Sequence, residues 1–198
     1  MEKNNLTPEE SFSIITNAIT SLKTNYKDNA KSFLLWGWML TFASISNFII
    51  IVILKQQEAW QLMGPLSLAN WFVFCLVTFI ILFFMDRKIN KTKKVYSLLE
   101  DYIKKLWIVY AVTMFTAIFL CIKLQLVPPP ILLLITGLAT TVTGLLIKFR
   151  PLIFGGIAFF VFSIAATFVT NEYLSLIVGA SIICGYLIPG YLLKSAKE

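Results

Sequence analysis

The sequence contains no histidine and few charged residues, 14% of its 198 positions against about 25% in an ordinary soluble domain. Without histidine, the commonest general base and transition-metal ligand is missing. The three cysteines, Cys75, Cys121 and Cys184, are too few and too widely spaced for a disulfide framework or a thiolate cluster. No phosphate-binding loop or nucleophile elbow occurs. We therefore predict a protein that is not an enzyme and that carries no cofactor or metal.

Hydrophobic residues are in excess and make up 58% of the chain. A helix needs about 20 apolar residues to cross a bilayer core about 30 Å thick. Six segments of about this length lack Asp, Glu, Lys and Arg: 33–54, 65–85, 106–122, 131–147, 151–171 and 173–193. The first follows a long polar stretch and has no cleavage site, which is not typical of a signal peptide. We predict an all-α, polytopic membrane protein with a six-helix transmembrane domain, residues 33–193.

Positive charge is distributed unevenly over the predicted connections. Of the 17 Lys and Arg residues, only Lys55 and Lys123 fall on one side of the membrane, and all the others fall on the opposite side. Because positive segments stay in the cytoplasm, both termini are predicted to be cytoplasmic. The net charge of +7 then lies next to the spans, where anionic lipid headgroups attract it. We expect the lipid bilayer as a partner and no nucleic acid.

The connections on the less basic side are short, at residues 55–64, 123–130 and around Glu172. Short connections make consecutive helices antiparallel neighbours, so we predict three helical hairpins. The run Pro128-Pro129-Pro130 is expected to stiffen the second of these connections, and Pro189 is expected to kink the sixth span.

Residues 1–32 are predicted to form a cytoplasmic amphipathic helix and a linker. Thr7-Pro8-Glu9-Glu10 has the pattern of a capped helix start. The apolar residues that follow are spaced three and four apart and form a narrow stripe: Phe12, Ile15, Ile19, Leu22 and Tyr26. Such a stripe is buried against the bilayer surface, against the protein's own cytoplasmic loops, or against a partner. A basic cytoplasmic segment, 86–105, is expected to be helical and to extend the third span, and residues 194–198 form a cytoplasmic tail.

Polar residues within the predicted spans are mostly hydroxyls, which commonly bond to their own helix backbone. Asn47 is the exception, because a buried amide in hydrocarbon needs partners more urgently. Small residues and one proline mark the last three spans and are predicted to pack helices closely, with a dimer interface or a ligand-lined cleft as alternatives. They are Gly137, Gly144, Gly156, Ser163, Ser181, Gly185 and Pro189.

Two stretches carry a resemblance to a known family. The amphipathic start followed by Phe33-Leu34-Leu35-Trp36-Gly37-Trp38, together with the closing residues 185–193, resembles an uncharacterised family of small six-span bacterial inner-membrane proteins. The resemblance would cover nearly the whole chain. Members are often encoded beside winged-helix regulators, so the resemblance implies the bacterial cytoplasmic membrane and a regulatory association, and no site residues.

Three functions remain open at this point. The first is a non-enzymatic membrane protein that senses the bilayer or a lipophilic signal, or that anchors a partner or a second copy through the N-terminal helix. The second is a small-molecule transport component, because the size and the cytoplasmic termini are similar to those of substrate-binding subunits of vitamin transporters. The third is an intramembrane enzyme, for which the sequence offers no catalytic constellation.

Overall fold

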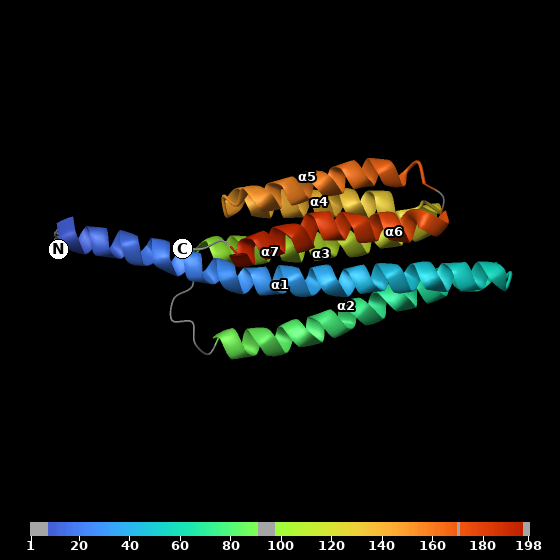
Figure 1. Cartoon of the computed structure of the whole chain (residues 1–198), viewed down its shortest axis with the longest axis horizontal. Coiled ribbons are helices and arrows are strands. Elements are labelled where there is room, and N and C mark those ends of the chain that lie inside the picture. The colour runs from blue at the N-terminus through green and yellow to red at the C-terminus, as the bar shows by residue number, and fades with distance from the viewer. Residues whose placement is uncertain (1–7, 91–97, 170, 196–198) are drawn as a thin grey trace.

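The computed structural model describes residues 8–90, 98–169 and 171–195. In these parts of the chain every regular element is a helix. Consecutive long helices run in alternating directions along one bundle axis, as the colours in Figure 1 allow the reader to follow. The predicted all-α class is therefore confirmed. The apolar segments form helices because a helix makes its backbone hydrogen bonds within itself, and hydrocarbon offers no other partner for these groups.

Helix α1, Pro8–Gln56, is 49 residues long and is the longest element. It includes both the predicted amphipathic segment and the predicted first span, and residues 27–32, expected as part of a linker, are helical. At 1.5 Å per residue the helix is about 73 Å long, more than twice the thickness of a bilayer core. Its N-terminal part extends beyond the ends of the other helices (Figure 1).

The next four helices are α2, Trp60–Asn90, α3, Leu98–Leu124, α4, Pro128–Leu146, and α5, Arg150–Ala166. The three prolines expected in the connection before α4 lie instead in its first turn. The first turn has no intrahelical acceptor for its N–H groups, so prolines cost nothing there. Three connections are tight and each contains a non-glycine residue with positive φ: Glu58, Gln125 and Lys148.

The last apolar segment consists of three elements: α6, Asn171–Ile182, the π-helix η1, Ile183–Leu187, and α7, Ile188–Ser195. The wide turn lies directly before Pro189. Proline has no N–H to donate to the carbonyl of Gly185, four residues earlier. The N–H of Ile188 bonds instead to the carbonyl of Ile183, five residues earlier. Where a kink was predicted, the structure places the π-helix η1 directly before Ile188 and Pro189.

Among the described residues, five helical stretches are long and apolar enough to cross a membrane: Lys31–Gln56, Trp60–Met85, Asp101–Leu124, Pro128–Leu146 and Glu172–Ser195. The predicted fifth span, 151–171, corresponds to α5, which has 17 residues and is shorter than each of these five stretches. Residues 167–169 after it form turns. The structure therefore supports a membrane protein with five full-length candidate spans and one shorter apolar helix.

The packing is closest on one side of the bundle. Helices α4 and α5 lie against each other, and α6, η1 and α7 fill the space between α5 and α1. Helix α2 packs on α1, and α3 packs on α4. The first and last apolar segments are thus brought together, since α1 contacts all three elements of the last segment. The sequence alone did not predict this contact between the first and last apolar segments.

Candidate functional site

A cluster of buried polar side chains joins α1 to α6. The amide Nδ2 of Asn47 donates to the hydroxyl of Ser175 over 2.8 Å. The hydroxyl of Ser44, one turn earlier on α1, donates to the backbone carbonyl of Ser175. All three side chains are at least 95% buried. Hydrogen bonds of this kind hold transmembrane helices together, because hydrocarbon offers polar groups no alternative partner.

Asn47, the residue that the sequence singled out, has one end of its amide unsatisfied. Its Oδ1 is buried and has no hydrogen-bond partner among the described residues. The surroundings are tight, since Ala43 and Ser44 are fully buried and a Cβ added at Gly179 would lie 2.8 Å from the Ser44 hydroxyl. An unsatisfied buried acceptor of this kind costs about 1–3 kcal/mol. The cluster therefore connects α1 to α6 and leaves one acceptor, Oδ1 of Asn47, without a partner among the described residues.

A second polar contact joins α1 to α2. Nδ2 of Asn70 donates to the carbonyl of Ala43 over 2.9 Å, and its Oδ1 accepts from the hydroxyl of Ser46. Both ends of this amide are satisfied, unlike those of Asn47. Sequence reasoning missed Asn70, although an amide within an otherwise apolar span was the same signal that singled out Asn47.

Aromatic side chains converge on the π-helix. Tyr186 is buried, and its ring lies edge-on to that of Phe159, with 5.0 Å between the centroids. Its hydroxyl lies 3.5 Å from that of Thr140 on α4. Close by along the bundle, the hydroxyls of Tyr110 and Thr136 are 3.1 Å apart. Neither tyrosine was predicted as a site residue, because a tyrosine in an apolar segment does not by itself reveal a partner.

The small residues predicted for helix packing lie at close backbone approaches. A Cβ at Gly144 would meet the Ile153 backbone N at 2.8 Å, and one at Gly156 would meet that of Thr141 at 2.7 Å. A Cβ at Gly137 would meet the Phe160 ring at 2.9 Å, and one at Gly185 would overlap the ring of Phe159. Two further glycines with neighbours closer than 3.0 Å were not singled out, Gly37 and Gly155, and Gly190 has its nearest neighbour at 3.0 Å.

The remaining predicted packing residues bond to backbone carbonyls or accompany the glycines. Ser163 donates to the carbonyl of Pro130 on α4 over 2.7 Å, a contact between helices. Ser181 donates to the carbonyl of Val178 in its own helix. The side chain of Pro189 is buried and lies near Gly155. Within the spans, threonines bond to carbonyls four residues earlier, as hydroxyls in hydrocarbon commonly do: Thr41, Thr78, Thr113 and Thr116.

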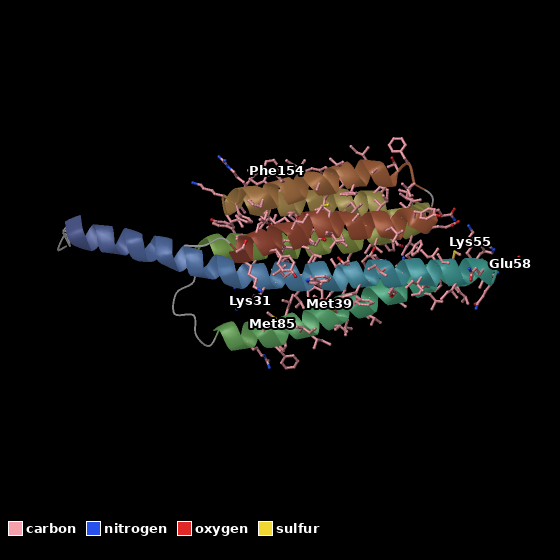
Figure 2. All side chains as sticks on the ribbon, in the orientation of Figure 1. Lys31, Met39, Lys55, Glu58, Met85 and Phe154 are labelled. Carbon is pink, nitrogen blue, oxygen red and sulfur yellow. The ribbon has the colours of Figure 1, made fainter. Side chains whose placement is uncertain are left out.

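The five residues of the predicted apolar stripe lie in the N-terminal part of α1. The structure describes the helical backbone there, and the side chains of residues 8–30 lie outside what it describes. In the described parts of the chain, no three His, Cys, Asp or Glu residues gather as metal ligands. Lys31 and Lys55 mark the two ends of the candidate span in α1 (Figure 2). At the second of these ends, Lys55 pairs with Glu172 at the start of α6.

Comparisons with models of protein families, with curated proteins and with solved structures give no match to this chain. The buried polar side chains described above join helices to one another. In the described parts of the chain, the N-terminal part of α1 extends beyond the bundle.

Proposed function

We propose that this chain is a non-enzymatic membrane protein that anchors a cytoplasmic partner through the N-terminal part of α1 and transmits the state of the membrane to it. The observation that carries the proposal is the length of α1. Its candidate span, Lys31–Gln56, takes up 26 of 49 residues. The preceding residues, 8–30, extend by about 35 Å at 1.5 Å per residue. A helix of this length outside the bilayer offers a surface that the bundle itself does not need.

The proposal includes the arrangement in the membrane. The chain crosses it six times as three antiparallel hairpins, with α5 as a short span, and both termini lie in the cytoplasm of a bacterium. Charge supports this orientation. Lys31, Arg87 and Lys194 lie near one end of the bundle, whereas Lys55 and Lys123 lie near the other. The first group is the one expected in the cytoplasm. We call it the basic end of the bundle.

Continuity between α1 and the bundle supports transmission. Beyond its N-terminal part, α1 contacts the last segment along the candidate span, where Gly37 lies against Leu187 of η1 and Ser44 bonds to Ser175. A rigid helix transfers a tilt or rotation from its packed part to its free part. A change in bilayer thickness that tilts the spans then changes the position of the partner.

Truncation tests the function directly. Deleting residues 1–26 should leave the bundle inserted and folded and should abolish association with the partner in native membranes. The expected result is an unchanged melting temperature in detergent with loss of the copurified protein. A truncated protein that no longer inserts, or that melts far lower, would make the N-terminal part a structural component of the bundle and would refute the proposal.

Accessibility tests the orientation. In a variant without native cysteines, cysteines placed at Gln57 and Glu172 should react with a membrane-impermeant maleimide in intact cells. Cysteines placed at Lys93 and Lys197 should react only after the membrane is opened. The reverse pattern would invert the proposed topology.

A further inference from the structure

The two sides of α1 differ within its candidate span. One side packs on the bundle and is formed by small and polar buried residues: Gly37, Thr41, Ala43, Ser44 and Asn47. The other side is exposed and is formed by large apolar residues, with 43–51% of each side chain accessible: Trp38, Phe42, Ile45 and Ile49. The first side faces protein and the second faces lipid, as expected for a peripheral helix of a membrane bundle.

The same two sides can be followed into the N-terminal part, because α1 is one uninterrupted helix from Pro8. At about 100° per residue, the centre of the apolar stripe lies within about 30° of the centre of the buried side. It lies about 130° from the centre of the exposed side. The positions centred on the exposed side carry polar residues instead: Ser13, Asn17, Thr20 and Thr24. The apolar stripe therefore continues the protein-facing side of α1.

Polarity is inverted where the helix leaves the candidate span. The exposed side changes from large apolar to polar residues, and the bundle side changes from small and polar to large apolar residues. Each change matches its solvent, since lipid requires apolar side chains at the surface and water requires polar ones. Along its whole length, α1 thus has one side whose residue types suit contact with solvent, either lipid or water. The residue types on its other side suit contact with protein.

From this we propose that the apolar stripe Phe12, Ile15, Ile19, Leu22 and Tyr26 docks an acidic amphipathic helix of a cytoplasmic protein, which lies over the basic end of the bundle. The inference rests on the proposed function and names the class of partner. The stripe repeats at three and four residues, the spacing of a seam that receives a second helix by knobs-into-holes packing. The interface continues the contact that α1 already makes with α6, η1 and α7.

Charge defines the partner further. On the bundle side of α1, the basic end carries Lys104 and Lys105 of α3, Lys148 and Arg150 at the start of α5, and Lys194 of α7. The acidic residues of α3 at this end are Glu100 and Asp101, and Asp101 pairs with Lys105 over 2.7 Å. In the N-terminal part of α1 before Lys31, Lys23 lies at the flank of the stripe, and the other charged residues are Lys27, Glu9, Glu10 and Asp28. The net positive charge is therefore that of the bundle residues. A helix lying over the basic end meets this charge, and acidic side chains on its flanks complement it.

Two other occupants fit the geometry less well. A bilayer surface would receive the stripe only if α1 bent sharply, and α1 continues as one helix out of the span. In a dimer, the α1 helices of both copies leave the membrane in the same direction. If their stripes paired, the α1 of the second copy would continue into the space that α6 and α7 of the first copy already fill. A helix supplied from the cytoplasm has neither restriction.

The test uses the full-length protein in nanodiscs of zwitterionic lipid and three labelled synthetic peptides. The first has three heptads with Ile and Leu in the seam and Glu on both flanks. The second has Lys on the flanks, and the third has the residues of the first in scrambled order. We expect the acidic heptad peptide to bind at least about tenfold more tightly than either control, with affinity that falls as salt rises.

Matched variants locate the binding surface. Changing Ile15 and Ile19 to Lys should weaken binding of the acidic peptide by about tenfold or more, although the added charge attracts it. Changing Asn17 and Thr20 to Lys adds the same charge on the opposite side and should not weaken it. Equal binding of the basic or the scrambled peptide, or equal loss in both variants, would overturn the proposal. So would a stripe-dependent dimer of the full chain in nanodiscs, or cross-linking of a photoreactive residue at position 19 to lipid.

The two proposals fail separately. If no peptide binds but deleting residues 1–26 still releases a native partner, the anchoring function stands and the acidic helix is wrong. If the deletion releases nothing, the anchoring function fails as well.

Discussion

The α4–α5–α6 side of the bundle and the α2 helix consist largely of apolar residues, yet they pack very differently. Half of the candidate span Glu172–Ser195 is buried, against 6% of Trp60–Met85 in α2. The closely packed side has glycines at its contacts, whereas the single glycine of α2, Gly64, has no atom within 4 Å of an added Cβ. Hydrophobicity does not drive association in lipid, so close approach depends on small residues. In this protein, the extent of burial therefore depends on small residues such as glycine and serine at the helix contacts, and not on how many leucines and phenylalanines a helix contains.

The largest effect is expected from a matched pair of phenylalanines. Phe159 is fully buried against Tyr186, whereas Phe115 of α3 is 73% exposed. Changing Phe159 to Ala leaves a cavity and should lower the free energy of unfolding by about 3 kcal/mol, the lower part of the range for such changes. Changing Phe115 to Ala should have almost no effect. Thermal unfolding in detergent measures both, and equal losses would place Phe115 in an interface.

A glycine pair should give the next largest effect. Changing Gly185 to Leu forces a side chain into the ring of Phe159 and should cost about 1–3 kcal/mol through overpacking. The same change at Gly64 meets open space and should leave stability unchanged within about 0.5 kcal/mol. An unchanged melting temperature for the Gly185 variant would show that this face does not pack as described.

Asn47 is buried and Asn70 is partly buried, and only Asn70 has hydrogen bonds at both ends of its amide. Changing Asn70 to Leu removes hydrogen bonds at both ends of its amide, to Ala43 and Ser46, and should cost about 1–2 kcal/mol. Changing Asn47 to Leu loses one bond but also removes an unsatisfied oxygen, so the net cost should be below about 1 kcal/mol. A larger loss at Asn47 than at Asn70 would mean that its Oδ1 is satisfied in the membrane by a bound donor.

The smallest effect concerns the ion pair between Lys55 and Glu172. Lys55 and Glu172 join α1 to α6, and both side chains are more than one-third exposed. Exposed pairs contribute about 0–1 kcal/mol, so changing Lys55 to Gln should lower stability by less than about 1 kcal/mol, and by less still at high salt. A loss that does not change with salt would indicate a steric role for the lysine stem.

Much of the fold could be predicted because the bilayer sets the length of its elements. The apolar segments beginning at Phe33, Pro65 and Leu106 each lie within a helix of the structure. The fifth segment, 151–171, was predicted too long, because the helix ends at Ala166 although apolar residues continue. Hydropathy indicates which residues are compatible with lipid, but it does not indicate the residue at which a helix ends.

The candidate site was predicted in part. Asn47 was singled out as a possible buried polar contact. In the structure its amide bonds to Ser175, from a distant part of the sequence, and its Oδ1 has no partner among the described residues. The aromatic cluster of Tyr186, Phe159 and Phe33 joins three different apolar segments. No local pattern indicates such a cluster.

By itself, the sequence determined the helical class, the approximate spans and the apolar stripe, because all three follow from the solvent that each residue requires and from the local helical period. Tertiary structure alone decided which helices touch. It placed the last segment against α1, opened a π-turn before Pro189, left Oδ1 of Asn47 unsatisfied and joined the stripe to the span without a break. The physical reason is that helix contacts in lipid depend on close shape complementarity between distant segments, and hydropathy along one segment carries no record of its neighbour.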